Sequence, residues 1–233
     1  MKRAIEQGAQ FRKGTVQSCT VTDGRITGVV VDGDIIPADI VIIAMGPWTG
    51  LASQWFSIPE ITSLKAHSIV LQPANPVTAD AIFLAYESKD GTLDPEIYPR
   101  PDGTVYLCGV SATVNTPASS RDVVPTDGAC ETLVEIASSV SKCLAEAPVK
   151  IKQACLLPIS PDDVPLIGAI PDVQGAFICS GHSCWGILNA PASALALAEL
   201  VVDGAAKLVD LSPFNPARFN VANEKRGRRR SGH

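Results

Sequence analysis

The 233-residue chain has few aromatic residues (5%) and few charged ones (18%), and these shortages exclude some classes of protein. Sparse aromatics leave little with which to stack the bases of a single-stranded nucleic acid. The net charge of −5 gives the body of the chain no basic surface for a nucleic acid. Apolar residues make up 46% of the chain, which is enough for a hydrophobic core and excludes a disordered chain. We therefore expect a folded protein that does not bind nucleic acid.

Motifs for metal binding, secretion and membrane insertion are also missing. The seven cysteines include no CxxC pair, so we expect neither a zinc site nor a thioredoxin-type redox pair. The first ten residues lack the apolar core of a signal peptide, and we expect a cytoplasmic protein, with association with an organelle or endosome left open. The apolar stretch 187–202 is short for a membrane span, so we expect no span and predict a buried helix there.

The hydrophobic pattern predicts many short strands and two longer helices. The run Ile40–Ala44 is continuously apolar, which is typical of a strand buried on both faces. Helices are predicted over about 126–146 and over 188–202, the second closed by Gly204. Strands are predicted at 15–21, 26–31, 35–36, 39–45, 68–72, 81–86, 96–100, 105–110, 151–157 and 176–179. Asp-Gly pairs at 23–24 and 32–33 predict hairpin turns.

Two glycine-containing segments follow predicted strands and are candidates for ligand binding. In residues 44–49 (AMGPWT) a glycine lets the backbone approach a ligand, although an ordinary strand-to-helix turn is the alternative. Residues 180–191 (SGHSCWGILNAP) open into a long helix, so their N–H groups and the helix dipole suit an anionic or electron-rich ligand edge. Neither segment is a phosphate loop by motif, because GxGxxG and Gly-Lys-Ser/Thr are both absent.

Together these segments resemble the FAD-dependent amine and amino-acid oxidoreductases of the D-amino-acid oxidase type, which include glycine oxidase and sarcosine oxidase. The resemblance is nearest to the poorly characterised members of fungi and plants. It is carried by Ala38–Trp48 and by four later stretches, Pro165–Gly168, Gly181–Ile187, Pro191-Ala192 and Ala198–Leu200, and it runs from residue 1 to about 215.

The resemblance implies an α+β fold made of two discontinuous parts. Residues 1–50 and 151–220 would form a partial FAD-binding domain, residues 51–150 an antiparallel-sheet substrate domain, and residues 221–233 a disordered basic tail. It also implies that the family's dinucleotide-binding βαβ unit is absent, so we expect a fragment or short isoform that is inactive alone. The strand at 39–45 would then expose an unpaired edge, which a partner chain is expected to cover.

The resemblance further implies an FAD site. In the family, the late loop lies along the flavin, the segment at 44–48 borders the ribityl and pyrophosphate groups, and a backbone position matched by Val16 meets the adenine. The implied cofactor-binding residues are Val16, Ala44, Gly46, Trp48, Cys155, Gly181, His182, Ser183, Cys184, Trp185, Gly186 and Ile187. Cys155 matches a cysteine that attaches FAD covalently in sarcosine-oxidase relatives, and a small core residue is the alternative.

The activity implied is hydride transfer from the C–N bond of a small amine or amino acid to flavin N5. Its weak catalytic candidates are His182, as a general base or a residue that positions the loop, and Arg100, as a carboxylate ligand or a solvated side chain. The family's oxygen-activating lysine is missing from the strand 105–109, and Leu157 stands where some relatives have arginine. The alternatives are a non-catalytic regulatory or binding protein that keeps the fold and, less favoured, a small α/β ligand-binding domain without flavin.

Overall fold

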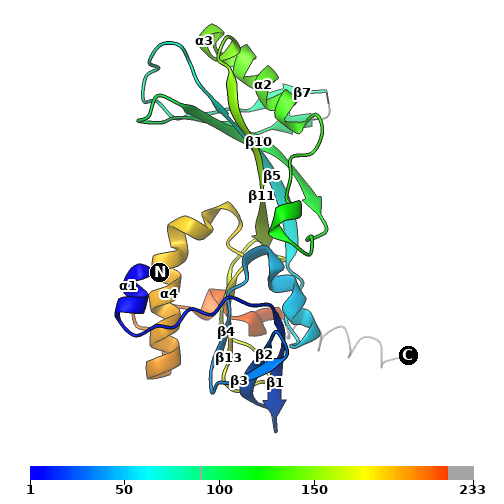
Figure 1. Ribbon diagram of the computed structural model, residues 1–233, viewed down its shortest axis with the longest axis vertical. Coiled ribbons are helices and arrows are strands. Elements are labelled where there is room, and N and C mark those ends of the chain that lie inside the picture. Colours follow the sequence, from blue (N-terminus) through cyan, green and yellow to red (C-terminus); the bar gives the residue numbers. More distant parts are fainter. Residues whose placement is uncertain (90, 220–233) are drawn as a thin grey trace, which may run out of the picture. The chain divides into compact units, whose positions relative to one another are not determined.

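The computed structural model describes residues 1–89 and 91–219, which form two compact units (Figure 1). Unit 1 contains Met1–Glu60, Val164–Ser180 and the chain from Trp185 onward, and unit 2 contains Ile61–Asp163 and Gly181–Cys184. Helices and strands are mixed along the chain, which confirms the α+β fold class. The predicted basic tail at 221–233 lies outside the described residues.

Unit 1 begins with a short helix and a three-stranded antiparallel sheet. Helix α1 (Lys2–Glu6) precedes strands β1 (Val16–Thr22), β2 (Arg25–Val31) and β3 (Asp34–Pro37), which lie in the order β1-β2-β3. Both predicted hairpin turns are confirmed. Their central residues have positive φ, 49° and 73° in Asp23-Gly24 and 53° and 91° in Asp32-Gly33, and such a pair suits the twist of a tight hairpin.

The second sheet of unit 1 has the order β12-β13-β4, built from β4 (Val41–Ile43), β12 (Leu166–Ala169) and β13 (Ala176–Ser180). Strand β13 is parallel to β4 and antiparallel to β12. The prediction that Ile40–Ala44 is buried on both faces is wrong. Ile43 is 4% exposed but Ile42 is 46% exposed, because only one face of β4 packs inward.

The helices of unit 1 follow these strands. They are η1 (Gly46–Gln54), α4 (Gly186–Asp203), η4 (Ser212–Phe214) and η5 (Pro216–Phe219), and Gly204 closes α4 at φ 79° as predicted. The short helix η3 (Ser183–Trp185) begins in unit 2 and leads into α4. The prediction that this helix is buried is wrong, since Ile187 is 95% and Val202 80% exposed. Among the described residues, Ser183–Asp203 is the stretch long and apolar enough to cross a membrane, a criterion that core helices of soluble proteins also meet.

Unit 2 is a five-stranded antiparallel sheet with helices on one face. The strands β5 (Thr62–Leu71), β6 (Ile82–Phe83), β9 (Glu96–Pro99), β10 (Val105–Val114) and β11 (Val149–Ile159) lie in the order β11-β5-β10-β9-β6. Strands β7 (Tyr86–Ser88) and β8 (Gly91–Leu93) form a separate hairpin, and η2 (Ser120–Asp122) precedes the helices.

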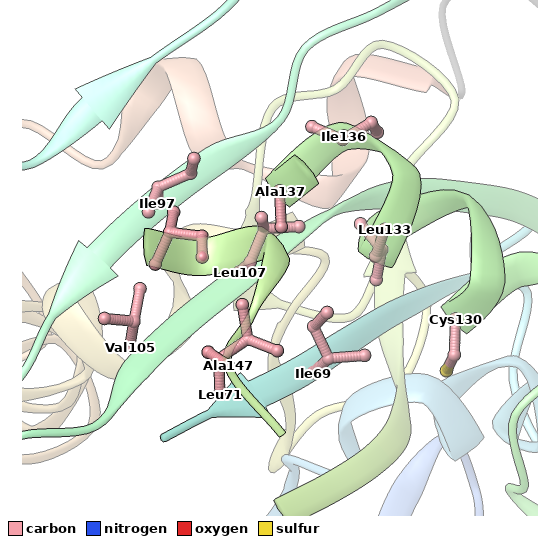
Figure 2. Packing of buried hydrophobic residues seen from close by; sticks show 11 residues of the cluster. Ile69, Leu71, Ile97, Val105, Leu107, Cys130, Leu133, Ile136, Ala137 and Ala147 are labelled. Carbon is pink, nitrogen blue, oxygen red and sulfur yellow. The ribbon is translucent and has the colours of Figure 1, made fainter. Parts of the chain in front are cut away.

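Helices α2 (Ala129–Val140) and α3 (Lys142–Ala145) supply one side of the core. Figure 2 shows Leu133 and Ile136 of α2 above Ile69 and Leu107 of the sheet, all four fully buried. The predicted single helix over 126–146 is wrong in one respect, because Ser141 is extended (φ −155°, ψ 135°) and separates the two helices. Its hydroxyl accepts a hydrogen bond from the Cys143 N–H at 3.2 Å and so caps α3.

A bulge in β10 changes which side chains face the helices. The register of β10 against β5 shifts between Cys108 and Val110. Gly109 lies at φ 134°, and a Cβ there would come within 2.4 Å of the Pro95 Cα, so only glycine fits. Before the bulge, Val105 and Leu107 face the helical core and Tyr106 and Cys108 face the opposite side.

Candidate functional site

The site begins at one edge of the parallel strand pair in unit 1. Because β4 and β13 run parallel, their carboxyl ends meet at the same edge of the sheet, where α/β sheets bind ligands. Strand β4 is followed by Gly46, which begins η1, and β13 ends at Ser180, directly before Gly181. The fold therefore brings together the two strand ends from which the predicted ligand-binding segments start.

Two buried hydroxyl groups fasten these strand ends to each other. The Thr49 Oγ1 and Ser180 Oγ atoms form a hydrogen bond of 2.7 Å, and the Ser180 hydroxyl also donates to the Gly46 carbonyl at 3.3 Å. Thr49 is 0% and Ser180 3% exposed. Sequence reasoning did not select either hydroxyl as a site residue. The only available signal was their position inside the two glycine-containing segments.

Around Gly46 the chain keeps its backbone accessible. Gly46 has φ 54°, and a Cβ at this position would have no heavy atom within 4 Å. Ala44 is exposed, and Gly46 and Trp48 are half-buried. A left-handed glycine with free space beside it, at the start of a helix, can present backbone N–H groups to a ligand.

The late loop has the backbone shape expected of a ligand-binding turn. Gly181 (φ 78°) and Ser183 (φ 52°) are both left-handed, and η3 then leads into the 18-residue helix α4. The exposed residues Cys184, Trp185 and Ile187 lie where the chain enters α4, around Gly186. The positive end of the α4 dipole therefore lies beside the loop.

His182 is half-buried and pairs with Ile159 at the end of β11 through an isolated antiparallel bridge. Burial lowers the pKa of its imidazole, because desolvation penalises the charged form. The neutral ring is therefore favoured near neutral pH, which suits a residue that positions the loop by hydrogen bonding.

Three other predicted residues lie elsewhere. Val16 begins β1, pairs with Val31 and so belongs to the antiparallel sheet of unit 1. Cys155 lies on β11 opposite Ala66 in unit 2, and desolvation raises the pKa of its thiol. The Arg100 guanidinium lies over the ring of Tyr106 in unit 2, with its carbon 4.9 Å from the ring centroid. Among residues 1–89 and 91–219, no three His, Cys, Asp or Glu side chains are grouped to hold a metal ion.

Comparison with known proteins assigns the chain to a family. The sequence model of the DAO family, FAD dependent oxidoreductase, matches residues 1–200. TDA3 of Saccharomyces cerevisiae, which is described as an oxidoreductase, is 38% identical over 185 residues. These residues are 77% of this chain and 34% of TDA3. Glycine oxidase of Pseudomonas putida is 28% identical over 195 residues, 83% of this chain and 49% of that enzyme. The chain belongs to the DAO family of FAD-dependent oxidoreductases.

A solved structure supports the fold. L-proline dehydrogenase from P. horikoshii superposes with a TM-score of 0.76 at 24% identity, over 95% of this chain and 58% of that one. This likeness shows the fold alone. The chain spans about a third to a half of the length of the curated relatives it matches. The predicted family and fold class are confirmed.

Proposed function

We propose that this chain supplies the flavin-binding loop and the substrate-binding sheet of an FAD-dependent oxidoreductase that acts on the C–N bond of an amine or amino acid. Family membership supports the oxidoreductase class. The name of one relative, glycine oxidase, points to a substrate with a C–N bond. The observation that carries the proposal is the joined edge at Gly46 and Ser180, where two adjacent parallel strands each lead into a helix.

The residues at this edge fit a cofactor with anionic and electron-rich groups. Gly46 has open space beside its left-handed backbone, and the left-handed residues Gly181 and Ser183 precede the start of α4. Backbone N–H groups at helix starts bind phosphates and other anions. We assign Ala44, Gly46, Trp48 and the loop 181–187 to holding FAD, with Val16 as the adenine contact. Residues 51–150 would carry the substrate.

FAD, when bound, would supply the acceptor for the hydride that leaves the carbon bonded to nitrogen. The protein's own contribution is orientation and electrostatics. The α4 dipole and the loop N–H groups favour negative charge on the ligand edge that they face. His182, held neutral by burial, positions the loop without adding a charge.

We propose that FAD is held without a covalent bond. Only the thiolate form of cysteine is a good nucleophile, and desolvation raises the pKa of the Cys155 thiol, which disfavours that form although the residue is exposed. An intact mass of the FAD-loaded protein under denaturing conditions should equal that of the bare chain. A mass increased by one FAD, and lost in Cys155→Ser, would establish the covalent link instead.

The proposed cofactor site is tested by titrating FAD into the purified chain and following flavin absorbance and fluorescence. Ser180→Ala removes the hydroxyl that joins the two strand ends and leaves Thr49 without this partner, so FAD affinity should fall by about tenfold. Ser138→Ala is the matched control, since that hydroxyl bonds only the Val134 carbonyl within α2 of unit 2. Equal FAD binding by both variants, or none by the unaltered chain, would contradict the proposal.

We also propose a cytoplasmic location and a partner at the outer edge of β4. Among the described strands, β4 pairs only with β13 and leaves one row of backbone groups available for a further strand. The partner could be another part of a longer product or a separate chain. Size-exclusion chromatography of the chain with and without candidate partners would detect such an association.

A further inference from the structure

Unit 2 contains a pocket between its sheet and the place where its helical layer breaks. The pocket has a volume of about 280 Å³ and is lined by side chains from residues 76–144. Its floor is the helical side of β6, β9 and β10, where Ile82 lies directly opposite Ile97 and Pro99 directly opposite Val105. Ile97 and Val105 are 1% and 0% exposed (Figure 2). The floor of the pocket is therefore part of the apolar core.

The walls of the pocket follow from the break between α2 and α3. Helix α2 ends at Val140, and the extended Ser141 leads the chain into α3, which supplies Cys143 and Leu144 to the lining. The loop after β5 supplies another wall through Val77. Val77 and Val140 are partly buried and pack against the same hydrophobic cluster as the floor. The walls are therefore mainly apolar as well.

The polar groups of the pocket carry no positive charge. No Lys, Arg or His of the described chain lines it, and its one charged side chain, Asp80, is exposed. A carboxylate or phosphate would therefore lose its water here without gaining a cation, which is costly. An exposed carboxylate such as Asp80 adds little to the binding of a cation. The lining thus favours an uncharged ligand.

The size of the pocket and one hydroxyl group define the ligand further. An apolar cavity of about 150 Å³ holds one benzene molecule, and this pocket has nearly twice that volume. It therefore has room for about ten non-hydrogen atoms, the size of two fused aromatic rings. The Ser141 hydroxyl accepts a hydrogen bond from the Cys143 N–H, so its own proton can be donated to a ligand oxygen.

We propose that this pocket, which we call the back pocket, binds an uncharged and largely apolar molecule of this size, with one hydroxyl or carbonyl oxygen at Ser141. The site goes beyond the proposed oxidoreductase function and does not depend on it. It is separate from the loop 181–187 that is assigned to FAD. Because Val105 and Tyr106 point to opposite faces of β10, the back pocket also lies on the other side of the sheet from the Arg100 guanidinium.

The test uses 2-naphthol, an uncharged bicyclic probe with one hydroxyl group. It is titrated into the purified full chain and followed by its own fluorescence, which responds to removal from water. A dissociation constant on the order of 0.1 mM is expected for a probe of this size. The anion 2-naphthoate has the same two rings and should bind at least about tenfold more weakly, because its carboxylate finds no basic partner.

Alkylation by iodoacetamide locates the bound probe. Cys143 and Cys19 are both free and half-buried, but Cys143 lines the back pocket and Cys19 lies on β1 of unit 1. At ten times its dissociation constant, 2-naphthol should slow the alkylation of Cys143 about tenfold, as measured by peptide mass spectrometry. The alkylation of Cys19 in the same sample should keep its rate.

Variants that fill the pocket complete the test. Cys143→Phe should weaken 2-naphthol at least about tenfold, whereas Cys143→Ser keeps the volume and should bind it within about twofold. Val140→Phe fills the pocket from α2 and is an independent variant should Cys143→Phe fold poorly by circular dichroism. Absence of saturable 2-naphthol binding, tighter binding of 2-naphthoate, or equal protection of Cys143 and Cys19 overturns the inference. None of these measurements uses flavin, so a failure of the proposed FAD site would leave them unchanged.

Discussion

His67 provides the sharpest test of the internal structure of unit 2. It lies on β5, is 2% exposed, and receives a hydrogen bond from the Thr126 N–H at its Nε2 atom (3.1 Å). The Nδ1 atom therefore carries the proton and donates it to the Val110 carbonyl at 2.9 Å. One imidazole thus joins the strand after the β10 bulge to the loop that leads into α2.

His67→Leu replaces the imidazole with an apolar side chain of similar bulk and removes both hydrogen bonds. An unsatisfied buried group costs about 1–3 kcal/mol, and because Thr126 is exposed enough for water to replace its partner, we expect a total of about 2 kcal/mol. That loss raises the unfolding constant of unit 2 about thirtyfold. His67→Gln, which retains a donor and an acceptor, should lose about half as much.

Urea unfolding followed by tyrosine absorbance reports on unit 2, because all three tyrosines lie there and all three tryptophans lie in unit 1. Amide hydrogen exchange adds a local readout, since the Thr126 proton should exchange faster in His67→Leu. A Leu variant within 0.5 kcal/mol of the unaltered chain, with unchanged exchange at Thr126, would refute the reasoning.

Three further predictions follow from individual contacts. Gly109→Ala should destabilise unit 2 by at least about 2 kcal/mol in urea, because its Cβ would meet Pro95, whereas Gly8→Ala, with no atom near its Cβ position, should cost less. Burial lowers the pKa of His182 in the folded state. Its contribution to the free energy of unfolding is therefore complete above about pH 6.5 and is lost as the pH falls toward the lowered value. In His182→Gln, the free energy of unfolding should depend less on pH in this range. The exposed side chains of α4, such as Ile187, together with the β4 edge, should make the isolated chain self-associate, and light scattering that shows a monomer at high concentration would contradict this.

Local sequence patterns predicted most strands and both hairpin turns of unit 1, because Asp-Gly pairs and alternating apolar residues act over a few residues. They failed where burial depends on distant segments. The apolar run at 40–44 has the composition of a central strand, yet β4 is an edge strand. Helix periodicity also continues through Ser141, and only the cap that this residue gives to α3 shows the break.

The candidate site was predicted only in part, because local patterns mark its segments but do not show which segments lie together. Glycines at 46 and 181 marked two strand ends, and parallel pairing of β4 with β13 brought them together, which no local pattern contains. Alternation in the stretch 96–100 places Glu96 and Tyr98 on one face, but the pairing of Glu96 with Phe83 emerges only from the sheet.

The insertion of unit 2 between β4 and β12 has a consequence for the order of folding. Its first and last long strands are paired, with Thr62 of β5 opposite Ile159 of β11, so a folded unit 2 brings its own two ends together. The parallel pairing of Ile42 with Phe177 then has to close a much shorter effective loop, which saves about 1 kcal/mol of chain entropy. Unit 2 should therefore fold first, and pulsed hydrogen exchange should show β5 amides protected before those of β13.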